Sequence, residues 1–145
     1  MLDLLLENYS KKLPIVIQGN AETNKGQLVR DFCDLLCQKG NIGYYKCLSS
    51  WDVLDNLIQA LCERRVLEWK AELLSSEIII IEDFQYVKKQ TVIAEELYKI
   101  FKSTNVSIII TTSIPVTNEN FYCEDLVAFL NMGLIVNLND RGINP

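Results

Sequence analysis

Apolar residues along the chain follow two different periods, and their alternation predicts strands and helices in turn. Short unbroken apolar runs predict strands at about residues 13–17, 42–48, 77–81, 106–112 and 134–138. Apolar residues three and four positions apart predict helices at about residues 1–10, 25–39, 50–61, 63–74, 92–101 and 118–130. The run at 77–81 ends in successive isoleucines, which is typical of a strand covered on both faces, as in a parallel sheet.

The predicted elements follow one another without an internal repeat, a linker or a low-complexity tract. Strands that alternate with helices form mostly parallel sheets covered by those helices. We therefore expect one domain over residues 1–145, with an α/β fold of three layers, a mostly parallel five-stranded sheet and helices on both faces. Because ligands bind such sheets beyond the carboxyl ends of the strands, candidate chemistry is sought after Ile17, Ile81 and Ile110.

The composition narrows the class of protein. Hydrophobic residues make up 49% of the chain and charged residues 23%, a balance that supports a folded core. The net charge of -5 argues against a broad binding surface for nucleic acid or anionic membrane. No apolar run approaches the ~18 residues of a membrane span, and the N-terminus lacks the basic region of a signal peptide. We expect a cytoplasmic protein without membrane contact.

The chain contains no histidine, which excludes Ser-His-Asp and Cys-His nucleophiles and every zinc site that depends on imidazole. Five cysteines without a Cys-x-x-Cys pair suit a reducing compartment. Cys33 and Cys37 can face one way on a helix, whereas Cys47, Cys62 and Cys123 are scattered. We expect these thiols to pack in the core rather than to bind metal.

The segment after the first predicted strand contains part of a phosphate-binding loop of the form GxxxxGK[ST]. Gly19 and Lys25 occupy their expected places, whereas Asn24 replaces the second glycine and Gly26 replaces the hydroxyl residue that holds magnesium. Glu22 adds a negative charge beside the place of the anion. Taken alone, the segment favours an ordinary turn with a solvated lysine over a phosphate cradle. The candidate cofactor-binding residues are Gly19, Asn24, Lys25 and Gly26.

Polar side chains also follow two later strands. Glu82 and Asp83 close the isoleucine strand, and adjacent carboxylates at a strand end can hold magnesium and orient an attacking water. Acids also end strands simply because strands end in water. Thr111, Thr112 and Ser113 follow the fourth strand, with hydroxyls that can sense a γ-phosphate or merely terminate the sheet. The candidate metal ligands are Glu82 and Asp83.

Four blocks of sequence point to a known family. Residues 78–86 (IIIIEDFQY) combine an apolar strand, an acidic pair and a Phe-Gln-Tyr segment, and residues 95–101 (EELYKIF) follow as an acidic and aromatic helix. Residues 108–115 (IIITTSIP) and 133–136 (GLIV) complete the set. Over about residues 13–140 the chain resembles the ATPase core of the DnaA family of bacterial replication initiators, within the AAA+ proteins. The resemblance implies a P-loop NTPase core, here without a lid domain.

The resemblance assigns roles to four residues. By it, Lys25 is the phosphate lysine, Glu82 the magnesium-side acid, Asp83 the water-orienting acid and Thr112 the sensor hydroxyl. With the loop changes described above, we expect these acids and the sensor to be vestiges of a catalytic site.

The arginine finger of the family is also replaced, by Phe129. Loss of an arginine finger alone slows phosphoryl transfer ~10³- to 10⁵-fold. We therefore expect a degenerate P-loop without efficient hydrolysis, and a regulatory or adaptor protein that binds a partner in replication initiation, either the initiator itself or the replication machinery. The first alternative is a domain that binds ATP or ADP, with magnesium, through Lys25, Glu82 and Asp83.

The second alternative is a weak single-stranded DNA contact. Its candidates are the densest basic group of the chain, Arg64, Arg65 and Lys70. Nearby glutamates favour a solvated helix with ion pairs four residues apart instead; they are Glu63, Glu68 and Glu72. Several aromatic residues can act as stacking platforms or as core, and we expect core for Tyr44, Tyr45, Trp51, Trp69, Phe121, Tyr122 and Phe129. At the former finger position, Phe129 can also anchor a subunit contact.

Overall fold

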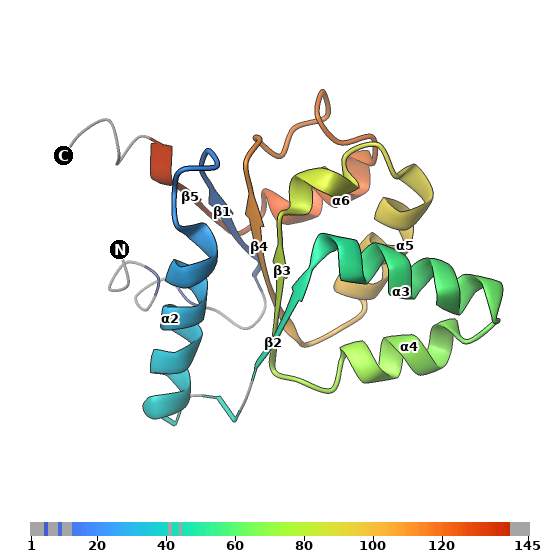
Figure 1. Cartoon of the computed structure of the whole chain (residues 1–145), viewed down its shortest axis with the longest axis horizontal. Helices are drawn as coiled ribbons and strands as arrows, with labels where there is room; N and C mark the ends of the chain where they lie inside the picture. Colours follow the sequence, from blue (N-terminus) through green and yellow to red (C-terminus); the bar gives the residue numbers. More distant parts are fainter. Residues whose placement is uncertain (1–4, 6–8, 10–12, 41, 44, 140–145) are drawn as a thin grey trace.

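A parallel five-stranded sheet forms the centre of the computed structural model, which describes residues 5, 9, 13–40, 42–43 and 45–139 (Figure 1). The strands are β1 (Ile15–Gln18), β2 (Tyr45–Ser49), β3 (Ile78–Glu82), β4 (Ser107–Thr112) and β5 (Leu134–Asn137). Their order across the sheet is β2-β3-β4-β1-β5, and all neighbours are parallel. The expected fold class is confirmed.

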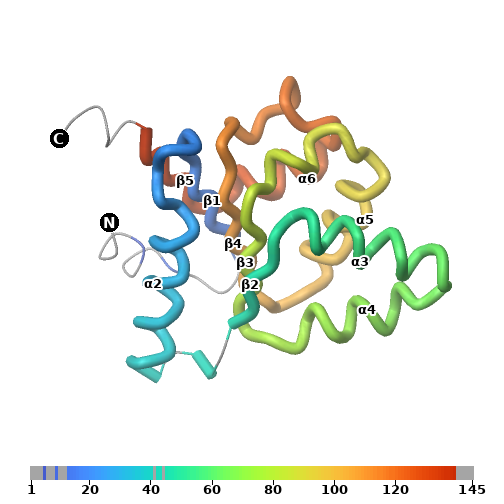
Figure 2. The backbone as a smooth tube through the Cα atoms, viewed as in Figure 1, coloured from blue at the N-terminus to red at the C-terminus, as the bar shows by residue number. Residues whose placement is uncertain are grey.

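The helices divide unequally between the two faces of the sheet, as Figures 1 and 2 show. One face is covered by α2 (Lys25–Gln38). The other is covered by α3 (Ser50–Cys62), α4 (Val66–Leu73), the 3₁₀ helix η1 (Phe84–Val87), α5 (Thr91–Lys102) and α6 (Glu124–Leu130).

Side chains along the central strands alternate between the two faces. Ile78 and Ile80 pack toward α2, whereas Ile79 and Ile81 pack toward the larger group of helices. All four are 0% exposed, so the strand is apolar on both sides.

Two local features fix the ends of elements. Ser49 caps α3, because its side-chain oxygen accepts a hydrogen bond from the backbone N–H of Asp52 at 3.1 Å. Before β5, a Cβ at Gly133 would lie 1.8 Å from the backbone oxygen of Pro14. Only glycine allows this approach, which also lets the Leu134 N–H donate to the same oxygen at 3.1 Å. Gly133 thus allows β5 to pair closely with β1.

Several boundaries differ from those that the sequence predicts. The second strand begins at Tyr45, and α4 begins at Val66 after a break at Arg64, whose φ is 57°. The helix expected at 118–130 begins only at Glu124, because residues 117–121 form a turn in which the Thr117 carbonyl accepts two backbone hydrogen bonds. The helix expected at 1–10 falls mostly outside the described residues.

The cysteine prediction is correct for two thiols and wrong for two others. Cys33 and Cys123 are buried, Cys37 is half-buried, and Cys47 and Cys62 are exposed. Burial raises the pKa of the Cys33 thiol to about 12, so this thiol stays protonated. Within the described ranges there is no group of three acidic or thiol side chains that could hold a metal ion. Nor does any described helix combine the length and apolar content needed to cross a membrane.

Replacing Gly133 with alanine should destabilise the fold by about 3 kcal/mol, because the added methyl meets the Pro14 backbone rather than a mobile side chain. Gly40→Ala is the control: its φ is 75°, but a Cβ there meets nothing within 4 Å. That change should lose only about 1 kcal/mol. Urea denaturation of both variants measures the difference, and equal losses would contradict this account of Gly133.

Candidate functional site

Three polar strand ends meet at one edge of the sheet. Because β3, β4 and β1 are neighbours in register, Ile81 lies opposite Ile110, and Gln18 lies opposite Thr112. The Gly19 N–H donates to the Thr112 carbonyl at 3.0 Å, which ties the start of the loop to the end of β4. The segment that resembles a phosphate-binding loop therefore lies beside both acids.

The loop closes on itself around Asn20. The Asn20 side-chain oxygen accepts from the Glu22 N–H at 3.0 Å, and the Asn20 carbonyl accepts from the Thr23 N–H at 3.1 Å. The Asn20 N–H donates to the side chain of Asn139 at 2.8 Å. Three backbone N–H groups of the loop, those of Asn20, Glu22 and Thr23, are thus paired inside the chain.

Lys25 turns into this loop instead of into water. Its side-chain amine donates to the Asn20 carbonyl at 2.8 Å and lies 3.3 Å from the Thr23 hydroxyl. The residue is 7% exposed, so the solvated lysine that the segment favoured is wrong. Desolvation lowers the pKa of the Lys25 amine, and the charge of Asp83 opposes part of that shift.

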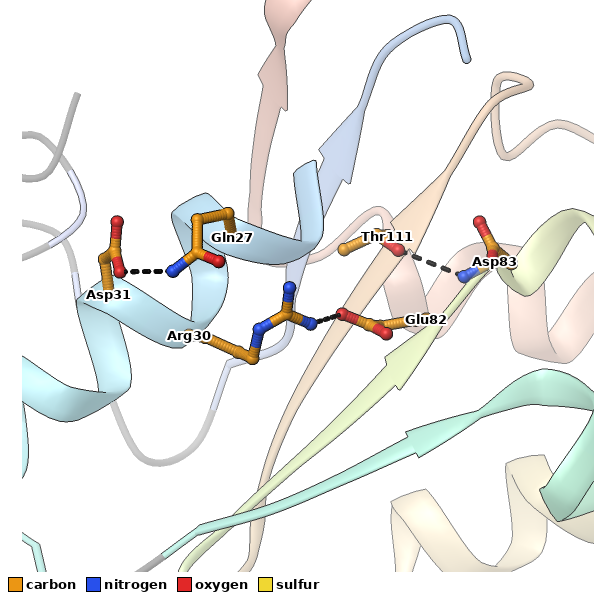
Figure 3. Close-up of polar contacts among 6 residues, drawn as sticks. All are labelled: Gln27, Arg30, Asp31, Glu82, Asp83 and Thr111. Atoms are coloured by element: carbon orange, nitrogen blue, oxygen red, sulfur yellow. Dashed lines mark hydrogen bonds and ion pairs between the residues drawn. The ribbon is translucent and has the colours of Figure 1, made fainter. Parts of the chain in front are cut away.

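An ion pair fills the place beside Gly26. Arg30 reaches from α2 to the end of β3, where its guanidinium nitrogen lies 2.5 Å from the Glu82 carboxylate (Figure 3). A Cβ at Gly26 would lie 2.4 Å from the same carboxylate oxygen and 3.2 Å from the guanidinium. A serine or threonine at this position is incompatible with the ion pair as it stands. Gly26, Arg30 and Glu82 form one set, which we call the Arg30–Glu82 lock.

Sequence reasoning missed Arg30. Its position one helical turn after Gly26 was a usable signal, because residues four apart share a helix face. The sequence did not indicate the partner of Arg30, because Glu82 lies 52 positions away along the chain.

The second acid is held by the neighbouring strand. Asp83 has a left-handed backbone, with φ of 60°, and its N–H donates to the Thr111 hydroxyl at 3.0 Å (Figure 3). The predicted sensor, Thr112, is 0% exposed, and its hydroxyl donates to the Ile114 carbonyl at 2.8 Å. The structure therefore gathers Lys25, Glu82 and Asp83 at one edge, with the Thr112 hydroxyl bonded to the backbone of Ile114.

The residues at this edge do not fit a magnesium ion as they stand. A magnesium ion needs oxygen ligands in near-octahedral geometry, but the Glu82 carboxylate is bound by a guanidinium and position 26 carries no hydroxyl. On the phosphate side, the N–H groups of Asn20, Glu22 and Thr23 have partners, and the Lys25 amine donates to the Asn20 carbonyl. A metal at Glu82 would have to displace Arg30, and a phosphate at Lys25 would have to draw the amine away from Asn20.

The family model of the bacterial DnaA ATPase domain matches residues 7–137. The chain belongs to this family. A search of curated proteins finds no match.

Solved structures agree with this assignment of the DnaA ATPase fold. Domain III of the Thermotoga maritima replication initiation protein DnaA has a TM-score of 0.80 and 18% identity, over 94% of this chain and 58% of that one. AMPPCP-bound DnaA from Aquifex aeolicus has a TM-score of 0.77 and 20% identity, over 94% and 44%. The DnaC helicase loader gives 0.68 and 13%, over 94% and 85%. The chain thus spans about half the length of the DnaA chains that it matches.

Of the basic group that lies between α3 and α4 and on α4, Arg65 is neutralised by its own chain. Arg65 pairs with Glu68 at 2.7 Å and with Glu63 at 3.7 Å. The expected ion pairs four residues apart are thus replaced by pairs at shorter spacing in the sequence. Lys70 donates to the Ser103 hydroxyl at 3.2 Å, and Arg64 is exposed. A cavity of about 300 Å³ beside them is lined by Arg65 and Lys46 but also by Glu63, Glu68 and Glu72. This mixture of charges is a poor match for a phosphate backbone.

The core prediction for the aromatic residues is right for most and wrong for two. Phe121 is buried, and Trp69 and Phe129 pack against the core. Phe129 lies 6.1 Å, centre to centre, from the Phe101 ring, so the residue at the finger position packs inside its own chain. Tyr45 is half-buried. Trp51 and Tyr122 are 56% and 57% exposed, contrary to expectation, and Tyr44 lies outside the described residues.

The Arg30–Glu82 lock predicts a non-additive double-mutant cycle. In the native protein Gly26→Ala should change stability by less than about 0.5 kcal/mol, because the helix gain of alanine is offset by displacement of the Glu82 carboxylate from its ion pair with Arg30. In a Glu82→Ala background the same change should stabilise the protein by roughly 0.5–1 kcal/mol, because only the helix gain remains. Urea denaturation of the four proteins gives the cycle, and equal effects in both backgrounds would contradict the steric account.

Proposed function

We propose that the protein is a non-hydrolysing member of the DnaA ATPase family, which acts in the cytoplasm as a regulatory or adaptor protein in replication initiation. The observation that supports this proposal is the Arg30–Glu82 lock. It places a guanidinium on the acid that the family uses beside magnesium, next to a position that carries no hydroxyl and where any side chain would displace the ion pair.

Phosphoryl transfer depends almost entirely on positioning and charge neutralisation. In this chain the metal acid is neutralised by Arg30, and the phosphate lysine is bonded to its own loop. The finger position holds Phe129, which cannot stabilise charge on a neighbour's nucleotide. Each change alone weakens catalysis, and together they favour a scaffold that works through binding.

Membership of the family, whose solved members include replication initiators, and the likeness to a helicase loader favour a role in replication. The partner we propose is the cell's own initiator, with the replicative helicase machinery as the other candidate. The alternative is nucleotide binding without turnover. Lys25 favours it, because a lysine occupies the phosphate-lysine position of the loop although burial there desolvates its amine.

Titration calorimetry with ATP and ADP, with and without magnesium, tests the site. We expect no binding at about 1 mM nucleotide and no release of phosphate above the blank. The Gly26→Ser/Arg30→Ala double variant removes the guanidinium and supplies a hydroxyl, so it should gain magnesium-dependent binding. Magnesium-dependent hydrolysis by the native chain that Lys25→Ala abolishes would refute the proposal. A double variant that also fails to bind would show that the lock is not what blocks the site.

The adaptor role is tested with the purified initiator and replicative helicase of the same cell. We expect the initiator to bind with a Kd of ~10 μM or tighter, measured by biolayer interferometry, with the same value with or without ATP in the buffer. Lys25→Ala should bind equally well, because the loop is not the contact. No binding of either protein at ~100 μM would contradict the adaptor role while leaving the absence of hydrolysis untouched.

A further inference from the structure

Two aromatic side chains stack on the surface where α3 begins. Trp51, in the first turn of α3, and Tyr86, in η1, have ring centres 4.8 Å apart. They are 56% and 45% exposed. In Figure 1 the segment that joins β3 to α5 runs beside the start of α3, so the pair bridges two elements.

The apolar surface continues along α3. Ile58 follows Trp51 by seven residues, which is about two helical turns, and it is 49% exposed. The residues that α3 buries form a separate stripe, Ser50, Val53, Leu54, Leu57 and Ala60. The helix is therefore apolar over a wider arc than its own core uses. Tryptophan and tyrosine in such a position are the residue types that dominate protein interfaces.

The two elements that carry the aromatic pair also carry exposed charges of opposite sign. Asp52 and Asp55 are exposed on α3, next to Trp51, and Lys88 and Lys89 are exposed directly after η1. Elsewhere on the surface, ion pairs within the chain engage Arg65 with Glu68 and Lys99 with Glu96. Among the described residues, no ion pair or hydrogen bond engages the side chains of these two aspartates and two lysines.

We propose that this surface, Trp51, Ile58 and Tyr86 flanked by Asp52, Asp55, Lys88 and Lys89, is a two-fold interface between two copies of this chain. A two-fold contact brings the same surface of each copy together in opposite orientation, so the aspartates of one copy face the lysines of the other. The aromatic pairs meet at the centre and lose their exposure to water. The aspartates and lysines have no ion-pair partner within the part of a single copy that the structure describes, and each would gain one in the two-fold dimer. A partner whose surface carries charge of only one sign could not pair with both.

Sedimentation velocity of the full chain over about 1–500 μM tests the contact. The native protein should be a dimer in the upper part of this range, and Trp51→Ala/Tyr86→Ala should weaken association at least ~30-fold. Leu67→Ala is the control, because Leu67 is 83% exposed but lies on α4, and it should leave association unchanged. Near-ultraviolet circular dichroism and melting curves show that each variant is folded.

Charge reversal identifies the two-fold geometry. A chain with Asp52→Lys/Asp55→Lys has four positive side chains around the surface, and a chain with Lys88→Asp/Lys89→Asp has four negative ones. Each alone should be a monomer, and an equimolar mixture should form a dimer of one copy of each. The chain with all four substitutions should recover dimer formation, because its opposite charges are restored in exchanged places.

Three results would overturn the proposal. The first is a native chain that stays monomeric at 500 μM, and the second is a dimer that the aromatic variant leaves intact. The third is a monomer that binds a single-stranded oligonucleotide, measured by fluorescence anisotropy, with loss of binding in the aromatic variant, which would assign the stacked rings to bases instead.

Discussion

The parallel pairing of β4 with both β3 and β1 is the constraint on which the rest of the structure depends. The paired strands are buried on both faces, and a slip of one residue would turn every side chain to the opposite face. The register is therefore fixed by the core. Because the strands end together, the loop, the two acids and the threonine hydroxyls are gathered at one edge whether or not they bind a ligand. Chemistry at that edge can be lost without loss of the fold.

The Arg30–Glu82 lock acts through the space it occupies more than through its energy. Both side chains are partly exposed, at 38% and 24%, and such pairs contribute ~1 kcal/mol or less. A guanidinium supplies a single charge and no open coordination position, so it neutralises the acid without activating a water. Together with the loop bonds around Asn20, it gives Glu82 and Lys25 partners within the chain. A ligand that used these two side chains would first have to displace those partners.

The sequence predicted the sheet well, because long runs of buried β-branched residues have few alternatives. It predicted the start of α6 poorly, since the turn at Thr117 depends on side-chain and backbone bonds that hydrophobic spacing does not record. It identified Lys25 correctly as the lysine of the loop, but it wrongly predicted that the Lys25 side chain is solvated. Trp51 was misassigned because periodicity identifies an apolar arc, and only the packed structure separates the buried stripe from the exposed one.

The strand-end site and the proposed interface share η1. Tyr86 lies three residues after Asp83, and between them Gln85 connects two strand ends: its side chain lies 3.5 Å from the Asp83 carboxylate and accepts the Ser113 N–H at 3.1 Å. Asp83 keeps a left-handed backbone because β4 holds its N–H through Thr111. The short helix is therefore anchored at its start by the same strands that form the site. A partner docked on Tyr86 meets a surface already rigid at its base, which reduces the entropy lost on binding. The strand ends that gather Lys25, Glu82 and Asp83 thus also hold the base of the surface that we propose as an interface.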